Sequence, residues 1–343
     1  MKVVMIGEAA SHQKEMSVAL EQAVEFVVLP VAAADDPAFD RQIEGADVLV
    51  AMRFQRPPGA APRIDLLHVP GAGLDRIAFD ALHPDTVVCN AFEHEIPIAE
   101  FVSLAMLQHE IGLGALQSAF DSERWSAAYR ARAPHGELHG KTQGIIGFGR
   151  IGQCIAARAR AFGMNVVALD KHAYPGKPAL PADRLLALSQ IDELLAIADY
   201  LVIACPLNDA TLGLIDAPAF ARMKPDAVLI NVSRAPIVDE DALYAALSTQ
   251  RISAAYLDVW YRYPIGADDD VPPSRHRFEA LPNAICTPHS AAWTQGLFAR
   301  RYASIAKNIN RLRNGELLHN VVHGDAGALR ERLAAASVEP GAI

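Results

Sequence analysis

The chain has 343 residues, of which 51% are hydrophobic and 21% charged, and its formal net charge at pH 7 is −9. This length predicts two domains of ordinary size, each with a sizeable core. The acidic balance argues against a general nucleic-acid-binding protein, which would carry a basic face. No run of 18 or more apolar residues is present, so no membrane span is expected.

The beginning of the chain and its cysteines predict a cytoplasmic protein that holds no metal ion. The first residues, MKVVMIGEAA, lack the basic region, apolar stretch and cleavage site of a signal peptide. The four cysteines, at positions 89, 154, 205 and 286, form no CxxC pair. Their spacing therefore disfavours a disulfide framework or a zinc site.

In the first hundred residues short apolar runs alternate with helical patterns, which is typical of a parallel α/β fold. A helix is expected over Glu15–Ala23. One small open sheet is expected from the strands Val3–Ile6, Phe26–Leu29, Val48–Ala51, Leu66–Val69 and Thr86–Cys89.

The stretch from Pro97 to Leu116 is apolar on nearly all sides. Such a helix is normally buried on more than one side, so we expect it between domains or at a subunit interface.

A second series of strands follows, and its spacing by crossover helices predicts a dinucleotide-binding Rossmann domain. A helix over Arg300–Arg313 is expected to return to the first domain, whereas the Ala- and Arg-rich sequence after Gly324 allows no assignment. The six expected strands are Gly144–Phe148, Asn165–Leu169, Tyr200–Cys205, Ala227–Val232, Ser253–Val259 and Asn283–Thr287.

A glycine motif, GFGRIG, joins the first of these strands to a helix. Gly147 permits a sharp turn, Gly149 lets the backbone approach a pyrophosphate, and Gly152 lets the helix pack closely on the strand. Asp170 lies 18 residues after the last glycine, at the end of the second strand. An acidic residue there accepts hydrogen bonds from the ribose hydroxyls and favours NAD over NADP, although Lys171 and the histidine that follows soften that preference.

Three later segments lie at carboxyl ends of expected strands, where ligands of open α/β sheets bind. They contain Arg234, Asp258 and His289. An arginine can clamp an anion, and a histidine can exchange protons near neutral pH.

Together with the glycine motif, these segments resemble the D-isomer-specific 2-hydroxyacid dehydrogenases, of which formate dehydrogenase is a relative. The resemblance covers roughly residues 45 to 322 and includes LHVPGAGLDRI, LHGKT before the glycine motif, and CPLNDATLGLI. It implies a two-domain α/β fold in which a Rossmann domain, residues 99–291, is inserted in a flavodoxin-like substrate domain, residues 1–98 and 292–343.

The resemblance also implies roles for individual residues. Arg234 would hold the substrate's carboxylate and carbonyl oxygen, His289 would exchange the proton at that oxygen, and Asp258 would contact the nicotinamide carboxamide. The substrate would also contact the backbone of Ala72 and Gly73, and Trp293 would wall its pocket. The dinucleotide is expected at Gly147, Gly149, Arg150, Ile151, Gly152, Asp170, Pro206, Thr211, Val232, Ser233 and Asp258.

In the implied reaction His289 takes the hydroxyl proton during oxidation and, when protonated, donates it back during reduction. Arg234 offsets the charge that develops on the substrate oxygen. The cofactor provides the hydride chemistry, and the protein positions and polarises the substrate.

The chain departs from the family pattern where a glutamate normally pairs with the catalytic histidine. Tyr263 stands there, and a neutral phenol can hydrogen-bond the ring but does not favour the imidazolium as a carboxylate would. We therefore predict a lower pKa for His289, and a reduction that fades at lower pH, than in relatives with the glutamate.

Two further departures concern the substrate. His94 stands where several relatives place an asparagine on the substrate, and it could equally be a surface histidine. Ala235 replaces the glycine that usually follows the arginine, which reduces the backbone freedom there.

Two other functions stay open from the sequence. Formate dehydrogenase also has a neutral residue at the position of Tyr263, in a similar Asp-Val-Trp context, so oxidation of formate or a similar non-hydroxy donor is one alternative. Corepressors related to the family use the fold to sense NADH, which is the other. The family and the apolar helix predict a homodimer that acts on a small carboxylate without nucleic-acid or membrane partners.

Overall fold

The computed structural model describes residues 1–171, 181–264 and 269–338. The chain forms two compact units, and each is described by itself. Unit 1 comprises residues 1–94 and the described residues from Thr294 onward, whereas unit 2 comprises the described residues between them, from Glu95 to Trp293.

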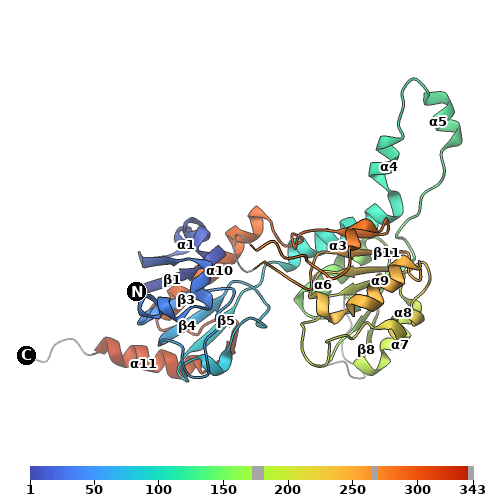
Figure 1. Ribbon diagram of the computed structural model, residues 1–343. Coiled ribbons are helices and arrows are strands. Elements are labelled where there is room, and N and C mark those ends of the chain that lie inside the picture. Colours follow the sequence, from blue (N-terminus) through green and yellow to red (C-terminus); the bar gives the residue numbers. More distant parts are fainter. Residues whose placement is uncertain (172–180, 265–268, 339–343) are drawn as a thin grey trace, which may run out of the picture. The chain divides into compact units, whose positions relative to one another are not determined.

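Unit 1 contains a sheet whose strand order is β13-β5-β4-β3-β1-β2 (Figure 1). Five strands run parallel and β13 pairs antiparallel with β5. The order 2-1-3-4-5 of the parallel strands is flavodoxin-like, as predicted. The strands are β1 Lys2–Ile6, β2 Glu25–Leu29, β3 Ala46–Val50, β4 Ile64–Val69, β5 Val87–Asn90 and β13 Val321–His323.

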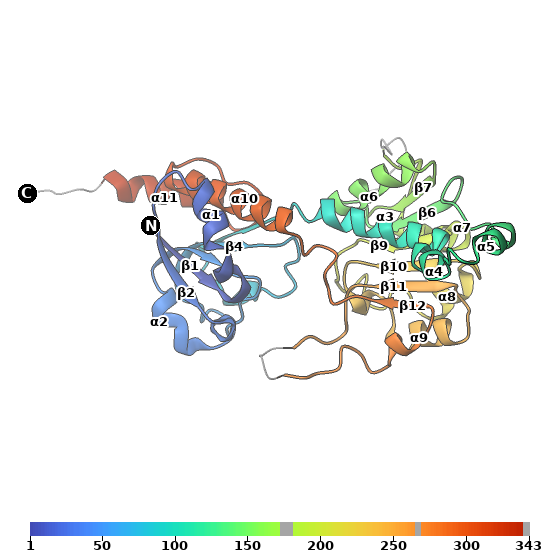
Figure 2. The ribbon, with the colours of Figure 1, turned by 90° about the horizontal axis from the view of Figure 1, so that it is seen from above.

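Helices cover both faces of this sheet, and therefore its central strands are apolar on both sides. On one face Val3, Val48 and Leu66 pack against α1 (Gln13–Ala19) and α10 (Gln295–Arg313), which lie side by side in Figures 1 and 2. On the other face Val4 and Leu49 pack with Ile43 of α2 (Asp40–Ile43).

The helix expected over Glu15–Ala23 ends earlier, at Ala19. The amide of Asn310 explains the difference, because its Nδ2 donates to the Ala19 carbonyl and its Oδ1 accepts from the Glu21 N–H. A tertiary partner therefore satisfies the backbone groups that a longer helix would have satisfied itself.

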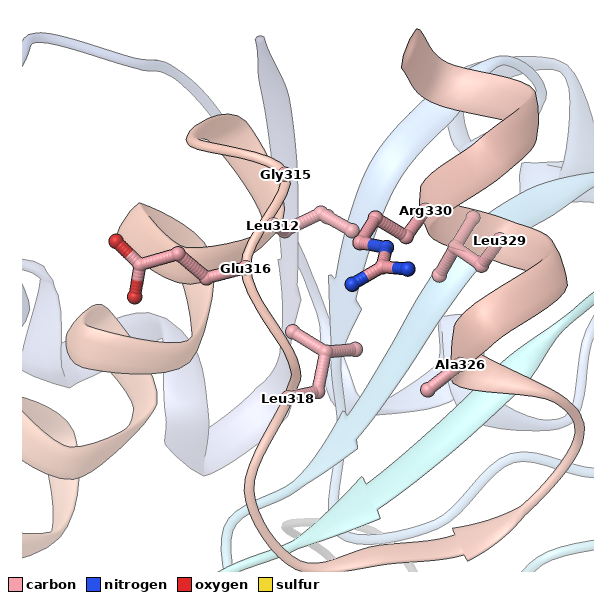
Figure 3. A pocket seen from close by; sticks show the side chains of 7 residues that line it. All are labelled: Leu312, Gly315, Glu316, Leu318, Ala326, Leu329 and Arg330. Atoms are coloured by element: carbon pink, nitrogen blue, oxygen red, sulfur yellow. The ribbon is translucent and has the colours of Figure 1, made fainter.

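A last helix, α11 (Ala326–Val338), follows β13 and packs through Leu329 on the same face as α10. Arg332 of this helix forms an ion pair with Asp65, with 2.6 Å between Nη2 and Oδ1. A narrow crevice lies between the end of α10 and the start of α11 (Figure 3). Its lining residues are Leu312, Gly315, Glu316, Leu318, Ala326, Leu329 and Arg330, and none belongs to a segment that the sequence predicts to be functional.

Unit 2 contains, in the part of the chain that the structure describes, seven parallel strands in the order β12-β11-β10-β9-β6-β7-β8. This is the Rossmann order extended by one strand, so the predicted fold is confirmed. The strands are β6 Thr142–Ile146, β7 Asn165–Leu169, β8 Arg184–Leu186, β9 Tyr200–Ile203, β10 Val228–Asn231, β11 Ala254–Leu257 and β12 Ala284–Cys286.

Two hydrophobic clusters cover the faces of this sheet. Ile145 and Val202 face α3 (Glu95–Ile111) and α6 (Arg150–Ala161). Leu201 and Leu229 belong to the cluster that includes α7, α8 and α9. These helices are Ile191–Ile197, Ala217–Arg222 and Glu240–Ser248. Figure 2 shows α3 and α6 lying side by side on their face of the sheet.

The long apolar helix expected from Pro97 to Leu116 has different bounds in the structure, where it begins at Glu95. It ends at Ile111, because Gly112 adopts a left-handed conformation (φ 59°) that stops the helix. Its buried residues face α6, whereas Leu104 is 63% exposed. The chain then forms an arm of two short helices, α4 (Leu113–Ser118) and α5 (Trp125–Ala131), which stands clear of the sheet of unit 2 (Figure 1).

None of the helices that the structure describes is long and apolar enough to cross a membrane.

Candidate functional site

The predicted functional residues of unit 2 follow successive strands of one parallel sheet. Gly147 follows β6, Asp170 follows β7 and Pro206 lies in the loop after β9. Arg234, Asp258 and His289 follow β10, β11 and β12. Because the strands are parallel, all these segments start at the same carboxyl edge.

The glycine motif has the geometry of a phosphate-binding turn. Gly147 has φ +100°, and a Cβ there would lie 2.6 Å from the backbone nitrogen of Cys205. A Cβ on Gly152 would overlap the Gly147 carbonyl oxygen, whereas one on Gly149 would meet no atom within 4 Å. Two glycines therefore permit close packing and the third faces open space.

Helix α6 starts at Arg150, directly after this turn, without a side-chain cap. Its first N–H groups and its dipole therefore favour an anion at this end. Arg150 is exposed and Ile151 packs partly on the core. These features fit the diphosphate of a dinucleotide.

Asp170 is fixed at the end of β7, because its backbone N–H donates to the Leu186 carbonyl of β8 at 3.0 Å. The side chain is half-buried. The histidine after Lys171 lies outside the described residues, as does the segment that follows it.

The loop after β9 is held by a hydrogen bond within itself and by one from the loop after β10. The Thr211 hydroxyl donates to the Pro206 carbonyl at 2.8 Å, and the Ser233 hydroxyl donates to the Cys205 carbonyl. Val232, beside Ser233, is buried. Burial raises the pKa of the Cys205 thiol to about 11, so this thiol stays protonated at neutral pH.

Arg234 is half-buried on the loop between β10 and α9, and its Nη1 donates to the Ser233 carbonyl at 2.9 Å. The buried amide of Asn231 holds this loop, because Oδ1 accepts from the Ser233 N–H and Nδ2 donates to the Arg234 carbonyl, both at 3.1 Å. Sequence reasoning missed Asn231. An asparagine at the end of a strand, just before a turn, often hydrogen-bonds the backbone two residues on, and this local signal could have identified it. Ala235 begins a 3-10 turn with ordinary backbone angles, which any L residue adopts.

His289 is exposed on the loop after β12, and its backbone has φ +56°. Its Nδ1 lies 2.9 Å from the hydroxyl of Tyr263, and the two ring centroids are 5.5 Å apart. The same hydroxyl accepts the backbone N–H of Trp260 at 3.0 Å. The structure therefore brings together the residue pair for which the sequence predicted contact.

Asp258 is 1% exposed, and its carboxylate accepts hydrogen bonds from the loop that carries His289. Oδ1 accepts from the Thr287 hydroxyl at 2.6 Å and from the Ser290 N–H at 2.8 Å, and Oδ2 accepts from the Ala291 N–H at 2.9 Å. Sequence reasoning did not identify these partners.

The predicted substrate contacts Ala72, Gly73 and His94 belong to unit 1. Ala72 and Gly73 follow β4, and the Asn90 amide donates to the Ala72 carbonyl at 3.2 Å. His94 is buried after β5, with its ring stacked on Phe92 at 6.2 Å between centroids. It is therefore not a surface side chain in this structure. Trp293, at the end of unit 2, is 59% exposed.

In the described part of the chain no group of three or more His, Cys, Asp or Glu side chains is arranged to hold a metal ion.

The comparisons with known proteins agree with this geometry. Residues 104–291 match the model for the D-isomer specific 2-hydroxyacid dehydrogenase, NAD binding domain. A D-3-phosphoglycerate dehydrogenase of Mycobacterium leprae is 34% identical over 279 residues, which are 80% of this chain and 50% of the relative. The chain belongs to the D-isomer specific 2-hydroxyacid dehydrogenase family. It spans about half the length of the curated phosphoglycerate dehydrogenases that it matches.

Solved structures share the two-domain fold. The D-lactate dehydrogenase of Lactobacillus jensenii, solved with NAD+, has a TM-score of 0.69 and 25% identity, over 94% of this chain and all of that one. An acyclic imino acid reductase, Bsp5, in complex with NADPH and D-Arg, has a TM-score of 0.75 and 24% identity, over 94% of this chain and all of that one. This second likeness concerns the fold alone.

Proposed function

We propose that the protein interconverts a D-2-hydroxy acid and its 2-keto acid with NAD. The observation that supports this most is the hydrogen-bonded pair of Tyr263 and His289, at the same sheet edge as Arg234 and the open glycine turn. That edge offers an acid/base, an anion clamp and a diphosphate cradle together. The cytoplasmic location expected from the sequence belongs to this proposal.

The residues of the carboxyl edge would hold the dinucleotide. The first turn of α6 would bind the diphosphate, and Asp170 would accept hydrogen bonds from the adenosine ribose. The remaining contacts would come from Pro206, Thr211, Val232 and Ser233. Asp170 supports NAD over NADP, since a carboxylate repels a 2′-phosphate.

In the proposed reaction the bound nicotinamide supplies or accepts the hydride at C2 of the substrate. Arg234 binds the carboxylate and the carbonyl oxygen, and offsets the charge that grows on that oxygen. His289 donates a proton to the oxygen in reduction and removes it in oxidation. The backbone of Ala72 and Gly73, with His94 and Trp293, would complete the substrate contacts.

Tyr263 takes the position of a carboxylate partner for His289. Its hydroxyl accepts from the Trp260 N–H, which leaves one O–H and one lone pair for Nδ1 of His289. The phenol can therefore orient the ring in either protonation state, but it adds no negative charge that would favour the imidazolium.

A substrate panel tests the proposal directly. Glyoxylate, hydroxypyruvate and phenylpyruvate are offered with NADH and with NADPH, and formate is offered with NAD. We expect keto-acid-dependent oxidation of NADH, with NADPH the poorer cofactor. Formate-dependent reduction of NAD without keto-acid turnover would instead favour a formate-type donor. Tight NADH binding without any turnover would favour an NADH-sensing binding protein.

We also propose that the arm of unit 2 mediates a homodimer. Along the arm Leu113, Leu116, Phe120, Trp125 and Tyr129 are all exposed. The Trp125 ring lies against the rings of Phe120 and Tyr129, with centroids 6.0 Å and 5.4 Å apart. An apolar patch of this kind on a projecting element is typical of a protein–protein interface.

The oligomeric state tests this proposal. Sedimentation of the wild type should give a dimer, and the double variant Phe120→Ser, Trp125→Ser should give a monomer. Leu317→Ser, which removes an equally exposed apolar side chain from unit 1, should leave the dimer intact. A monomeric wild type would refute the proposal.

A further inference from the structure

The turn that carries His289 needs support from its surroundings. His289 is a non-glycine residue with φ +56° and its side chain is exposed. Such a conformation costs free energy and persists only where neighbouring groups fix it. Within the turn, the His289 N–H donates to the Thr287 carbonyl at 3.0 Å.

Asp258 supplies most of that support from the neighbouring strand. Its two oxygens accept the Thr287 hydroxyl and the N–H groups of Ser290 and Ala291, so they bind the turn on both sides of His289. These bonds span 29 to 33 residues of sequence. A buried carboxylate that accepts three donors fixes their positions strongly, because each bond is charge-assisted.

The backbone of Asp258 is itself an extension of the sheet. Leu257 pairs in register with Asn231 of β10, and the Asp258 N–H donates to the Asn231 carbonyl at 3.2 Å. Two residues later, the indole Nε1 of Trp260 donates to the Thr287 carbonyl at 2.9 Å. The turn is therefore held by a rigid strand end.

We propose that Asp258 is a positioning residue that fixes the backbone of residues 287–291 and so keeps the His289 ring at the Tyr263 hydroxyl. The inference rests on the proposed function and assigns Asp258 a different role from the contact with the nicotinamide carboxamide that the family resemblance implies. These hydrogen bonds direct both oxygens to the turn, so the chief effect of the carboxylate is on the histidine.

The two roles give different kinetics. Asp258→Asn keeps the size of the side chain but places an NH₂ group against one of the N–H donors. A displaced His289 should lower kcat for keto-acid reduction on the order of 10²-fold, while the dissociation constant of NADH, measured by fluorescence, changes less than about twofold. If Asp258 instead contacted the nicotinamide, the variant would show the reverse, with NADH binding weakened and kcat largely retained. This result would overturn the proposal.

A second measurement does not depend on turnover. In Asp258→Asn at least one of the amide hydrogens of Ser290 and Ala291 should exchange faster, because the NH₂ group replaces the acceptor of one of them, and the ring signals of His289 in NMR spectra should shift. Unchanged exchange at both amides would also overturn the proposal.

Milder variants guard against a protein that fails to fold. Thr287→Val removes one donor and should give a smaller decrease in kcat, and Thr287→Ser, which retains the hydroxyl, should restore it. Asp199→Asn is the matched control, because Asp199 accepts the Thr142 N–H and pairs with Lys224 at the opposite edge of the same sheet. It should lower stability without changing kcat.

Failure of the inference and failure of the proposed function are distinguishable. If the wild type turns over no keto acid, the proposed function fails, and the amide exchange still decides whether Asp258 fixes the turn. If the wild type is active and Asp258→Asn retains its kcat, only the inference fails.

Discussion

At both edges of the unit 2 sheet a carboxylate accepts backbone N–H groups, but this contact has a different role at each edge. At the amino edge the carboxylate of Asp199 accepts the Thr142 N–H at 2.7 Å and pairs with the Lys224 ammonium at 2.7 Å. At the carboxyl edge the carboxylate of Asp258 likewise accepts backbone N–H groups. The first contact joins two strands, whereas the second holds a turn with an exposed histidine.

A second hydrogen-bond and ion-pair network at the amino edge also joins structural elements and carries no predicted functional residue. The side chain of Glu110, at the end of α3, is 5% exposed; it accepts the Tyr200 hydroxyl, and its Oε1 lies 2.6 Å from the Lys141 ammonium. Acids there are thus paired with strand-end donors. The carboxyl edge instead presents an open glycine turn, an arginine and a histidine. We infer that the amino edge serves stability and the carboxyl edge serves binding and catalysis.

The largest expected effect is on the carboxyl edge. His289→Gln removes the proposed acid/base and should lower kcat for keto-acid reduction about 10²- to 10⁴-fold. The melting temperature should stay close to that of the wild type, because the ring is exposed. Steady-state kinetics and calorimetry on one preparation test both statements. A variant that keeps a third of the wild-type kcat would exclude His289 as the acid/base.

A buried histidine of unit 1 gives a contrasting case, in which burial keeps an ionisable group neutral. His68 on β4 is 1% exposed, its Nε2 lies 3.1 Å from the Asn308 amide nitrogen, and burial lowers its pKa to about 4 from 6.5. The unfolded chain therefore binds this proton more readily. Stability from the neutral ring is present above pH 6.5 and is lost as pH falls toward 4, by up to about 3 kcal/mol.

Chemical denaturation between pH 4 and 7 measures this loss, and His68→Gln should flatten the dependence on pH. His83, which lies in the same unit with a side chain 39% exposed, provides the control: His83→Gln should leave the slope unchanged. A wild-type stability that does not change between pH 4.5 and 7 would contradict the expectation.

The amino edge should respond in stability alone. Glu110→Gln removes the charge that pairs with Lys141 but leaves an oxygen to accept the Tyr200 hydroxyl. The free energy of unfolding should fall by about 1–3 kcal/mol, while kcat of the folded protein stays unchanged. Urea unfolding and kinetics below the transition test this. A loss of kcat at full stability would show that the edges are not separate in function.

Much of this architecture follows from the sequence because its signals are local. The apolar strands fix the two sheets, and parallel order then places Arg234 and His289 at one edge without knowledge of their distance. The glycine motif can be recognised in the sequence because each glycine meets a separate steric requirement. The three-residue strands β8 and β13 were missed, whereas β12, which is equally short, was predicted within the run Asn283–Thr287.

Other features depend on partners remote in sequence. No residue near Ala19 indicates that the Asn310 amide will donate a hydrogen bond to the Ala19 carbonyl. Likewise, no side-chain pattern identifies the N–H groups of Ser290 and Ala291 as donors to Asp258. The pairing of Tyr263 with His289 could be predicted only because the family resemblance assigns a partner to that position.

The smallest expected effect, and the one that best resolves the chemistry of the carboxyl edge, concerns the partner of His289. Tyr263→Glu places a carboxylate at the imidazole and should favour the imidazolium. The pKa of His289 should rise, so keto-acid reduction, which needs the protonated ring, should persist to a pH higher by on the order of one unit. Oxidation, which needs the neutral ring, should begin at correspondingly higher pH.

The profiles of kcat/KM against pH for wild type and Tyr263→Glu test this, with Tyr263→Phe as the control that removes the hydrogen bond without adding charge. Tyr263→Phe should lower kcat but leave the pH limit near that of the wild type. If Tyr263→Glu and the wild type gave the same profile, the tyrosine would not set the protonation of His289. The difference between the two edges would then rest on Asp258 and Arg234 rather than on the charge beside the imidazole.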